Sequence, residues 1–287
     1  VPRELRYTRE GRAEVFVASY QQVAMQDGFF ETLMENKRWM VVFDEAHHLA
    51  DDAVWGPAAH KLPAVFRLFM SATPIRSDAK LIIGMPTTVD ENGQLTFKAD
   101  VNVTYQAAIE EKAIKVPRGH IQHYFIDVMV DGSDAPQRIE TKDLLAEDVK
   151  DFSAYEAKKG LRYNNKFLSR ILSDSISRLC EKKLQHPGQH QALAFAMSCR
   201  HAESVCDHFN LIAPGCADWI GVSRSDKDNA AVIRQFLDNS LDVLVQVDKL
   251  GEGFDLPRIS VLIFLNLIQA EAKVFQQIGR GMRRNMS

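Results

Sequence analysis

Apolar residues along the chain alternate between short runs rich in β-branched side chains and longer stretches with helical spacing. The rhythm is clearest in the second half, where the pattern predicts strands at residues 192–197, 219–222, 242–247 and 261–265. Helices are predicted at residues 167–184, 200–209 and 229–237. Alternation of this kind favours a parallel sheet that is covered by helices on both faces.

The first half carries similar elements at wider intervals. Its apolar runs predict a buried strand at residues 14–18, further strands at 41–43, 65–70 and 120–128, a short helix at 29–36, an alanine-rich helix at 105–109 and a solvated helix at 139–160. A break at Val116-Pro117-Arg118-Gly119 marks the expected boundary. We therefore expect an α/β protein of two domains, the first at residues 1–116 and the second at 117–287.

Composition narrows the class of protein. The 287 residues are 46% hydrophobic, which is enough for a sizeable core, and no apolar run approaches the length that spans a bilayer. The four cysteines form no C-x-x-C pair and indicate reduced thiols, so we expect a soluble, cytoplasmic protein with no membrane partner. A net charge of −3 argues against a uniformly basic surface, although main-chain N–H groups and hydroxyls can also hold a phosphate backbone.

Two carboxylates follow the buried run Val41-Val42-Phe43 directly, at Asp44 and Glu45. The carboxyl end of a strand in a doubly wound sheet is where ligands bind. One interpretation is that Asp44 holds a Mg²⁺ ion on nucleotide phosphates while Glu45 deprotonates the attacking water. The other is a solvated strand end, which a lone Asp-Glu pair does not exclude.

Polar residues also follow the neighbouring strands. Ser19-Tyr20-Gln21 follows the strand at 14–18 and could contact a nucleic-acid backbone or simply cap the next helix. Ser71 and Thr73 follow the strand at 65–70 and could couple two sites or form a turn before Pro74. Metal binding by His47 and His48 is disfavoured, because no second cluster of ligands lies at a suitable spacing.

Two further motifs lie near the end of the chain. Gly251-Glu252-Gly253-Phe254-Asp255 permits close approach of the backbone to a ligand, or is an ordinary glycine-rich turn. In the predicted helix that follows, Gln276, Arg280 and Arg283 are spaced to share one face. Two guanidinium groups on one face suit a polyanion and an arginine finger, while the alternative is a solvated basic helix end.

Together these stretches resemble the superfamily-2 helicase and translocase core. Asp44-Glu45-Ala46-His47 resembles its Walker B motif, Ser71-Ala72-Thr73 its coupling motif, Gly251 to Asp255 its fifth motif and Gln276 to Arg283 its sixth. Within that superfamily the chain looks most like the type III restriction subunits and related DNA-repair helicases. The resemblance covers nearly the whole chain.

The resemblance implies two RecA-like domains, with ATP bound between them and Mg²⁺ held through water by Asp44. It implies catalytic roles for Asp44, Glu45, Gln276, Arg280 and Arg283, coupling roles for His47, Ser71 and Thr73, and nucleotide contacts at Gly253, Asp255 and Gly279. Nucleic acid would contact Ser19, Tyr20 and Gln21 on the first domain and Ser198, Arg200 and His201 on the second. DNA, double- or single-stranded, is favoured over RNA, and partner subunits of a restriction, repair or defence complex are expected.

The sequence departs from this family in one respect. It contains no G-x-x-x-x-G-K-[ST] phosphate loop, which should precede Val1 together with the first strand of the sheet. We therefore expect the first domain to be incomplete at its N-terminus and these residues alone to be inactive in ATP hydrolysis. Two other functions stay open: a catalytically inactive helicase-like scaffold that binds nucleic acid, and an RNA-directed helicase.

Overall fold

A computed structural model describes residues 5–7, 14–26, 28–49, 54–72, 81–89, 91, 95–120, 125–128, 135, 137–140, 160–186, 188–250, 254, 256–266 and 271–284. The contacts divide the chain into two compact units. The first unit comprises residues 1–103 and 269–276, and the second comprises residues 104–268 and 277–287. The predicted boundary between residues 116 and 117 remains a prediction.

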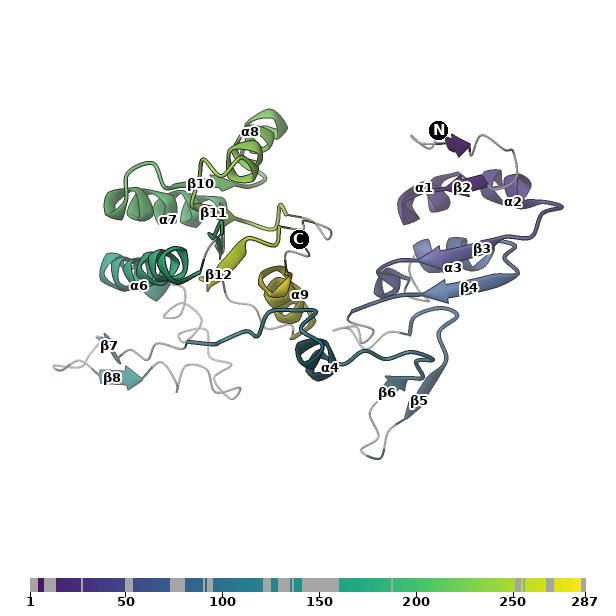
Figure 1. Cartoon of the computed structure of the whole chain (residues 1–287), viewed down its shortest axis with the longest axis horizontal. Helices are drawn as coiled ribbons and strands as arrows, with labels where there is room; N and C mark the ends of the chain where they lie inside the picture. Colours follow the sequence, from purple (N-terminus) through teal and green to yellow (C-terminus); the bar gives the residue numbers. More distant parts are fainter. Residues whose placement is uncertain are drawn as a thin grey trace. The chain divides into compact units, whose positions relative to one another are not determined.

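The second unit is built on a four-stranded parallel sheet in the order β10-β11-β9-β12. Figure 1 labels β10, β11 and β12 of this sheet. Its strands are β9 (Gln191–Phe195), β10 (Ala217–Ile220), β11 (Val243–Gln246) and β12 (Ile259–Phe264). Its long helices are α6 (Asn165–Gln185), α7 (Cys199–Ile212), α8 (Asp226–Leu237) and α9 (Glu271–Met282), which begins in the first unit. Each strand and helix predicted between residues 167 and 265 is confirmed, with its ends shifted by a few residues.

Alternate residues of β9 pack in different cores, which explains why this strand is mostly apolar. Ala192 and Ala194 of β9 pack in the core that includes α6 and α7, while Leu193 and Phe195 pack in the core that includes α8. A strand buried on both faces needs an unbroken apolar run, and β9 and β11 are buried at every position. The apolar stripe of α6 ends earlier than the sequence predicts, because Cys180 and Leu184 are exposed.

The first unit contains the parallel pair β3 (Met40–Phe43) and β4 (Phe66–Phe69), as predicted. A core lies on one face of this pair, formed with α1 (Tyr20–Met25), α2 (Phe29–Met34), the short helix η1 (Ala46–His48) and α3 (Trp55–His60). The other face is apolar and open, since Met40, Val42, Phe66 and Leu68 are between 37 and 56% exposed. Parallel sheets are normally covered on both faces, and this pair is covered on one.

Several shorter elements complete the described structure. They are β1 (Leu5–Tyr7), β2 (Glu14–Phe16), β5 (Thr87–Val89), β6 (Leu95–Phe97), α4 (Tyr105–Glu110), β7 (Phe125–Val128) and β8 (Gln137–Glu140). The prediction of a buried strand at 14–18 is wrong, because β2 pairs with β1 as an antiparallel hairpin and leaves Val15 and Val17 exposed. Residues 139 and 140 belong to a strand instead of the predicted helix, whose residues 141–159 lie outside the described ranges. No helix among the described residues is long and apolar enough to cross a membrane.

Candidate functional site

The two carboxylates lie in a turn at the carboxyl end of β3. The Asp44 side chain is exposed, and its Oδ1 accepts a hydrogen bond of 3.0 Å from the Glu45 N–H. Glu45 has φ 50° and ψ 49°, the left-handed region that side chains with a Cβ adopt rarely. Such a conformation costs about 1–3 kcal/mol and is found most often at functional sites.

Three hydrogen bonds from outside the turn fix its shape. The Ala46 N–H donates to the Met70 carbonyl at 2.9 Å, and the Met70 N–H donates to the Phe43 carbonyl at 2.9 Å. The Tyr20 hydroxyl donates to the Asp44 carbonyl at 2.5 Å. The turn is therefore attached both to the end of β4 and to the first residue of α1, which compensates for the strain at Glu45.

His47 connects the acidic turn to the predicted coupling segment. Its ring is 9% exposed, and its Nδ1 lies 3.0 Å from Ser71 Oγ and 3.4 Å from Glu45 Oε2. Its Nε2 lies 3.4 Å from Nε2 of Gln276, which belongs to the same compact unit. An amide N–H can donate only to an unprotonated ring nitrogen, so these contacts fit the tautomer with the proton on Nδ1. The structure thus brings together four predicted site residues: Glu45, His47, Ser71 and Gln276. Thr73 lies outside the described residues.

The acidic turn suits Mg²⁺ that is held mainly by phosphates and water. Mg²⁺ usually keeps several water ligands and binds one or two protein carboxylates together with substrate phosphates. The exposed carboxylate of Asp44 at the end of β3 meets that requirement. The described residues contain no group of three or more histidine, cysteine, aspartate or glutamate side chains that could hold a metal ion.

The segment Ser19-Tyr20-Gln21 has a clear structural role. Ser19 is the N-cap of α1 and forms a capping box with Gln22, so the predicted capping function is confirmed. The ring of Tyr20 stacks on that of Trp55 with 6.4 Å between centroids. Burial, together with the negative charges of Asp44 and Glu45, raises the pKa of Tyr20 to about 12, so the hydroxyl stays protonated and can donate to Asp44. The side chain of Gln21 is exposed.

The second predicted nucleic-acid segment lies at the start of α7. Ser198 is the N-cap of this helix, and its hydroxyl lies 3.0 Å from that of Tyr163, a residue that the sequence gave no reason to select. Arg200 is exposed. His201 is fully buried, which corrects the prediction that its side chain contacts nucleic acid. Its Nδ1 accepts from the Met197 N–H at 3.2 Å and its Nε2 donates to the Arg162 carbonyl at 3.0 Å, so the ring is a core element.

The burial of His201 predicts a loss of stability in acid. Burial lowers its pKa from 6.5 to about 4, so the folded state resists the proton that the unfolded state accepts below pH 6.5. The neutral ring therefore makes its full contribution to the free energy of unfolding above pH 6.5, and this contribution is lost as the pH falls to about 4. Between pH 7 and pH 4 the free energy of unfolding should fall by about 3 kcal/mol more in the wild type than in His201→Gln. Urea unfolding at both pH values measures this difference, and parallel losses in the two proteins would contradict it.

The glycine-rich motif lies mostly outside the described residues, which include Phe254 but not Gly251, Glu252, Gly253 or Asp255. The residues on either side of the motif, Leu250 and Leu256, are described. The residue before it, Leu250, is buried, and its carbonyl accepts a hydrogen bond of 3.3 Å from Arg280 Nη2. The guanidinium of Arg280 is thus anchored at the start of this loop.

The helix that carries Arg280, α9, differs from its prediction at one position; we call it the arginine helix. Gln276, Gly279 and Arg280 lie within α9, but the helix ends at Met282. Arg283 lies beyond the helix, is exposed, and forms an antiparallel bridge with Ile114. It therefore does not share a helix face with Gln276 and Arg280 as the spacing predicts, because pairing with a distant segment ends the helix before it.

The two glycines of α9 have different surroundings. A Cβ at Gly281 would lie 2.8 Å from Leu262 Cδ1 and 3.0 Å from Leu262 Cγ, whereas a Cβ at Gly279 would meet nothing within 4 Å. Overpacking costs about 1–3 kcal/mol, and alanine in place of glycine favours a helix by about 1 kcal/mol. We expect Gly281→Ala to lower the midpoint of thermal unfolding and Gly279→Ala to leave it unchanged or raise it. Equal midpoints for the two variants would refute this account of the packing.

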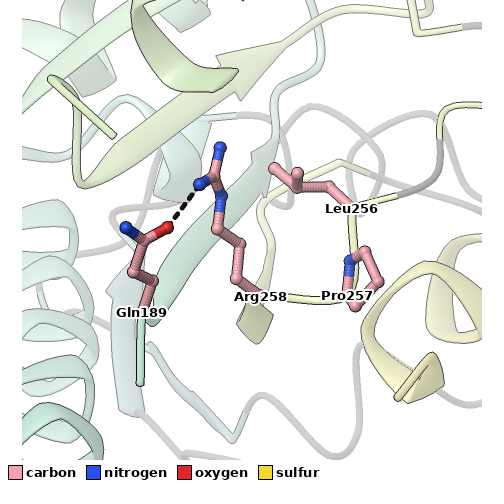
Figure 2. A pocket seen from close by; sticks show the side chains of 4 residues that line it. All are labelled: Gln189, Leu256, Pro257 and Arg258. Atoms are coloured by element: carbon pink, nitrogen blue, oxygen red, sulfur yellow. Dashed lines mark hydrogen bonds between the residues drawn. The ribbon is translucent and has the colours of Figure 1, made fainter. Parts of the chain in front are cut away.

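A surface hollow of about 340 Å³ lies at the start of β12 and is lined by Gln189, Leu256, Pro257 and Arg258 (Figure 2). Arg258 Nη1 donates to Gln189 Oε1 at 2.5 Å, and its Nη2 donates to the carbonyls of Phe236 and Leu237. None of the predicted site residues lines it. The guanidinium has a structural role here, because it ties the start of β12 to the end of α8.

Comparison with known proteins agrees with this arrangement. Residues 174–285 match the family model of the helicase conserved C-terminal domain, and residues 3–76 match that of the type III restriction enzyme, res subunit. The chain is 24% identical over 272 residues to "Uncharacterized protein ML1624" of Mycobacterium leprae, covering 92% of this chain and 44% of that protein. It is 24% identical over 249 residues to "Putative helicase 22" of the Sulfolobus islandicus filamentous virus, covering 85% of this chain and 40% of that protein.

One solved structure supports the fold. "The fragment structure of a putative HsdR subunit of a type I restriction enzyme from Vibrio vulnificus YJ016" aligns with a TM-score of 0.51 and 15% identity, over 86% of this chain and 40% of that chain. The chain thus spans less than half the length of each of these relatives.

The fold and the site define a two-unit α/β protein that has an acidic turn after a parallel strand in one unit and an arginine helix at the end of the chain. Together with the two family matches, these features support a superfamily-2 helicase core that has RecA-like domains and resembles the type III restriction subunits.

Proposed function

We propose that the chain is the motor core of an ATP-dependent DNA helicase or translocase. The observation that carries this proposal is the strained acidic turn, in which Glu45 adopts a left-handed conformation while His47 connects it to Ser71. Strained residues cluster at active sites and switch regions, and here the strain falls on a carboxylate beside a buried histidine and a hydroxyl. The helicase and restriction-subunit family matches support the same function.

The described side chains suit different steps of ATP hydrolysis. Asp44 is available to a metal ion through water, and Glu45 to accept the proton of the attacking water. Mg²⁺, when bound, would neutralise charge on the phosphates. Gln276 would position the water and the γ-phosphate, and Arg280 and Arg283 would stabilise the charge that develops on it. Gly253, Asp255 and Gly279 are proposed to contact the nucleotide.

The coupling of hydrolysis to movement is assigned to the contacts of His47. Any shift of Glu45 or Gln276 would be transmitted to Ser71 through this one imidazole, because its ring nitrogens lie within 3.4 Å of all three side chains. A contiguous set of contacts of this kind can connect a nucleotide site to a nucleic-acid site. We assign Thr73 to the same role, and nucleic-acid contacts to Ser19, Tyr20 and Gln21 and to Ser198 and Arg200.

ATP hydrolysis by the full-length protein tests this proposal. The rate should be measured at saturating ATP with no nucleic acid, with single- and double-stranded DNA, and with RNA of the same length. We expect DNA to stimulate hydrolysis more than RNA does. Absence of hydrolysis in every reaction would instead favour an inactive scaffold, and stronger stimulation by RNA would favour an RNA-directed helicase.

A further inference from the structure

The residues on either side of the glycine-rich loop, residues 251–255, accept hydrogen bonds from cations of other parts of the second unit. At its start the Leu250 carbonyl accepts from Arg280 Nη2 at 3.3 Å. After its end the carbonyls of Pro257 and Ile259 both accept from Nζ of Lys115, the second at 2.9 Å. Figure 2 shows Pro257 at this exit, directly before β12. Lys115 lies more than 140 residues earlier in the sequence, so only the fold brings it here.

Lys115 also holds the end of the arginine helix. Its main-chain N–H donates to the Met282 carbonyl at 2.6 Å. The segment around it runs beside the residues that follow α9, since Ile114 bridges Arg283 and Arg284 Nη1 donates to the Lys112 carbonyl at 2.8 Å. One residue thus contacts both the exit of the glycine-rich loop and the helix that carries Arg280.

The ammonium of Lys115 bonds two main-chain carbonyls at once. The ammonium is half-buried and donates to main-chain carbonyls, and burial with the nearby charges of Lys182 and Arg284 lowers its pKa. Removing a cation from water costs free energy, which an apolar side chain of similar length would avoid. The three donors of an ammonium can, however, satisfy two carbonyls at once and fix their positions.

We propose that Lys115 is a positioning residue for Arg280. Lys115 joins Pro257 and Ile259 at the start of β12 to Met282 at the end of α9, the helix that carries Arg280. With the hydrogen bond from Arg280 to the Leu250 carbonyl, this contact fixes the orientation in which the guanidinium of Arg280 leaves the helix. This inference rests on the proposed function, because it assigns Arg280 to the γ-phosphate.

The test is a double-mutant cycle in the full-length protein, with kcat and KM for ATP measured for Lys115→Met, Arg280→Lys and the double variant. Methionine keeps the length of the side chain and removes its donors. A misplaced catalytic group can cost about 10- to 100-fold in rate, so we expect Lys115→Met to lower kcat by that amount with KM almost unchanged. In the Arg280→Lys background the same change should have little further effect, because there is no guanidinium left to position.

Lys112→Met is the matched control, since Lys112 is exposed and contributes only its main-chain carbonyl to this region. It should leave kcat unchanged. A wild-type kcat in Lys115→Met, or the same fold-loss in both backgrounds, would overturn the inference and reduce Lys115 to a structural residue. If Lys115→Met fails to fold, Lys115→Gln, which keeps two amide donors, takes its place in the same cycle. If the wild type itself fails to hydrolyse ATP, the proposed function is the part that fails.

Discussion

Replacing Glu45 with glutamine should lower kcat for ATP hydrolysis by the full-length protein by about 10²–10⁴-fold, the usual contribution of a general base. Glutamine has the same shape and can occupy the left-handed position at the end of β3, but it cannot accept a proton from water. The affinity for ATP should be retained, because the carboxylate acts on the water and not on the nucleotide. Steady-state hydrolysis together with equilibrium binding of a fluorescent ATP analogue separates the two effects.

Glu35→Gln is a suitable control for this prediction. Glu35 is the exposed C-cap of α2 and has no assigned role, so its replacement removes the same charge from the same unit. We expect its kcat to match that of the wild type. Equal activity of Glu45→Gln and the wild type would show that Glu45 is not the base.

Replacing Arg280 with lysine should have an effect at least as large. An arginine finger contributes about 10³–10⁵ in rate, and lysine keeps the charge but loses the planar fork that binds two oxygens at once. The same change removes the hydrogen bond from Arg280 to the Leu250 carbonyl, which anchors the guanidinium beside the glycine-rich loop. The loss should appear in kcat under single-turnover conditions with saturating ATP.

Arg234→Lys provides the comparison for Arg280→Lys. Arg234 is exposed in the last turn of α8, in the same unit as Arg280, and is not among the predicted site residues. Its conservative replacement should leave the single-turnover rate unchanged. A rate in Arg280→Lys within a few-fold of the wild type would exclude the arginine-finger role.

The sequence predicted the second unit well because its local signals agree with its tertiary structure. The strands β9 and β11 are buried on both faces and therefore carry unbroken apolar runs. The helices α7 and α8 begin at the serine caps Ser198 and Ser225, residues that favour this position for their own hydrogen bonds. Where local preference and packing point the same way, sequence is sufficient.

The errors occur where a distant contact decides the outcome. The spacing of Gln276, Arg280 and Arg283 is helical, yet pairing with Ile114 ends α9 before Arg283. His201 lies in an N-terminal turn that suits an exposed ligand contact, but the Arg162 carbonyl and a close approach of Tyr163 enclose it. Lys115 gave no local signal at all, since its partners are Pro257, Ile259 and Met282. Contacts between residues so far apart in the sequence leave no periodic pattern in it.

We propose that the carboxylates of Asp44 and Glu45 and the guanidinium groups of Arg280 and Arg283 act on one nucleotide. A structure of the full-length protein with ADP, aluminium fluoride, Mg²⁺ and DNA tests it most directly. The account predicts that the fluoride group is contacted by Arg280 on one side, with Asp44 beside the metal ion and Glu45 beside the attacking water. A nucleotide bound elsewhere, or bound with Asp44 and Glu45 turned away from Arg280 and Arg283, would contradict it.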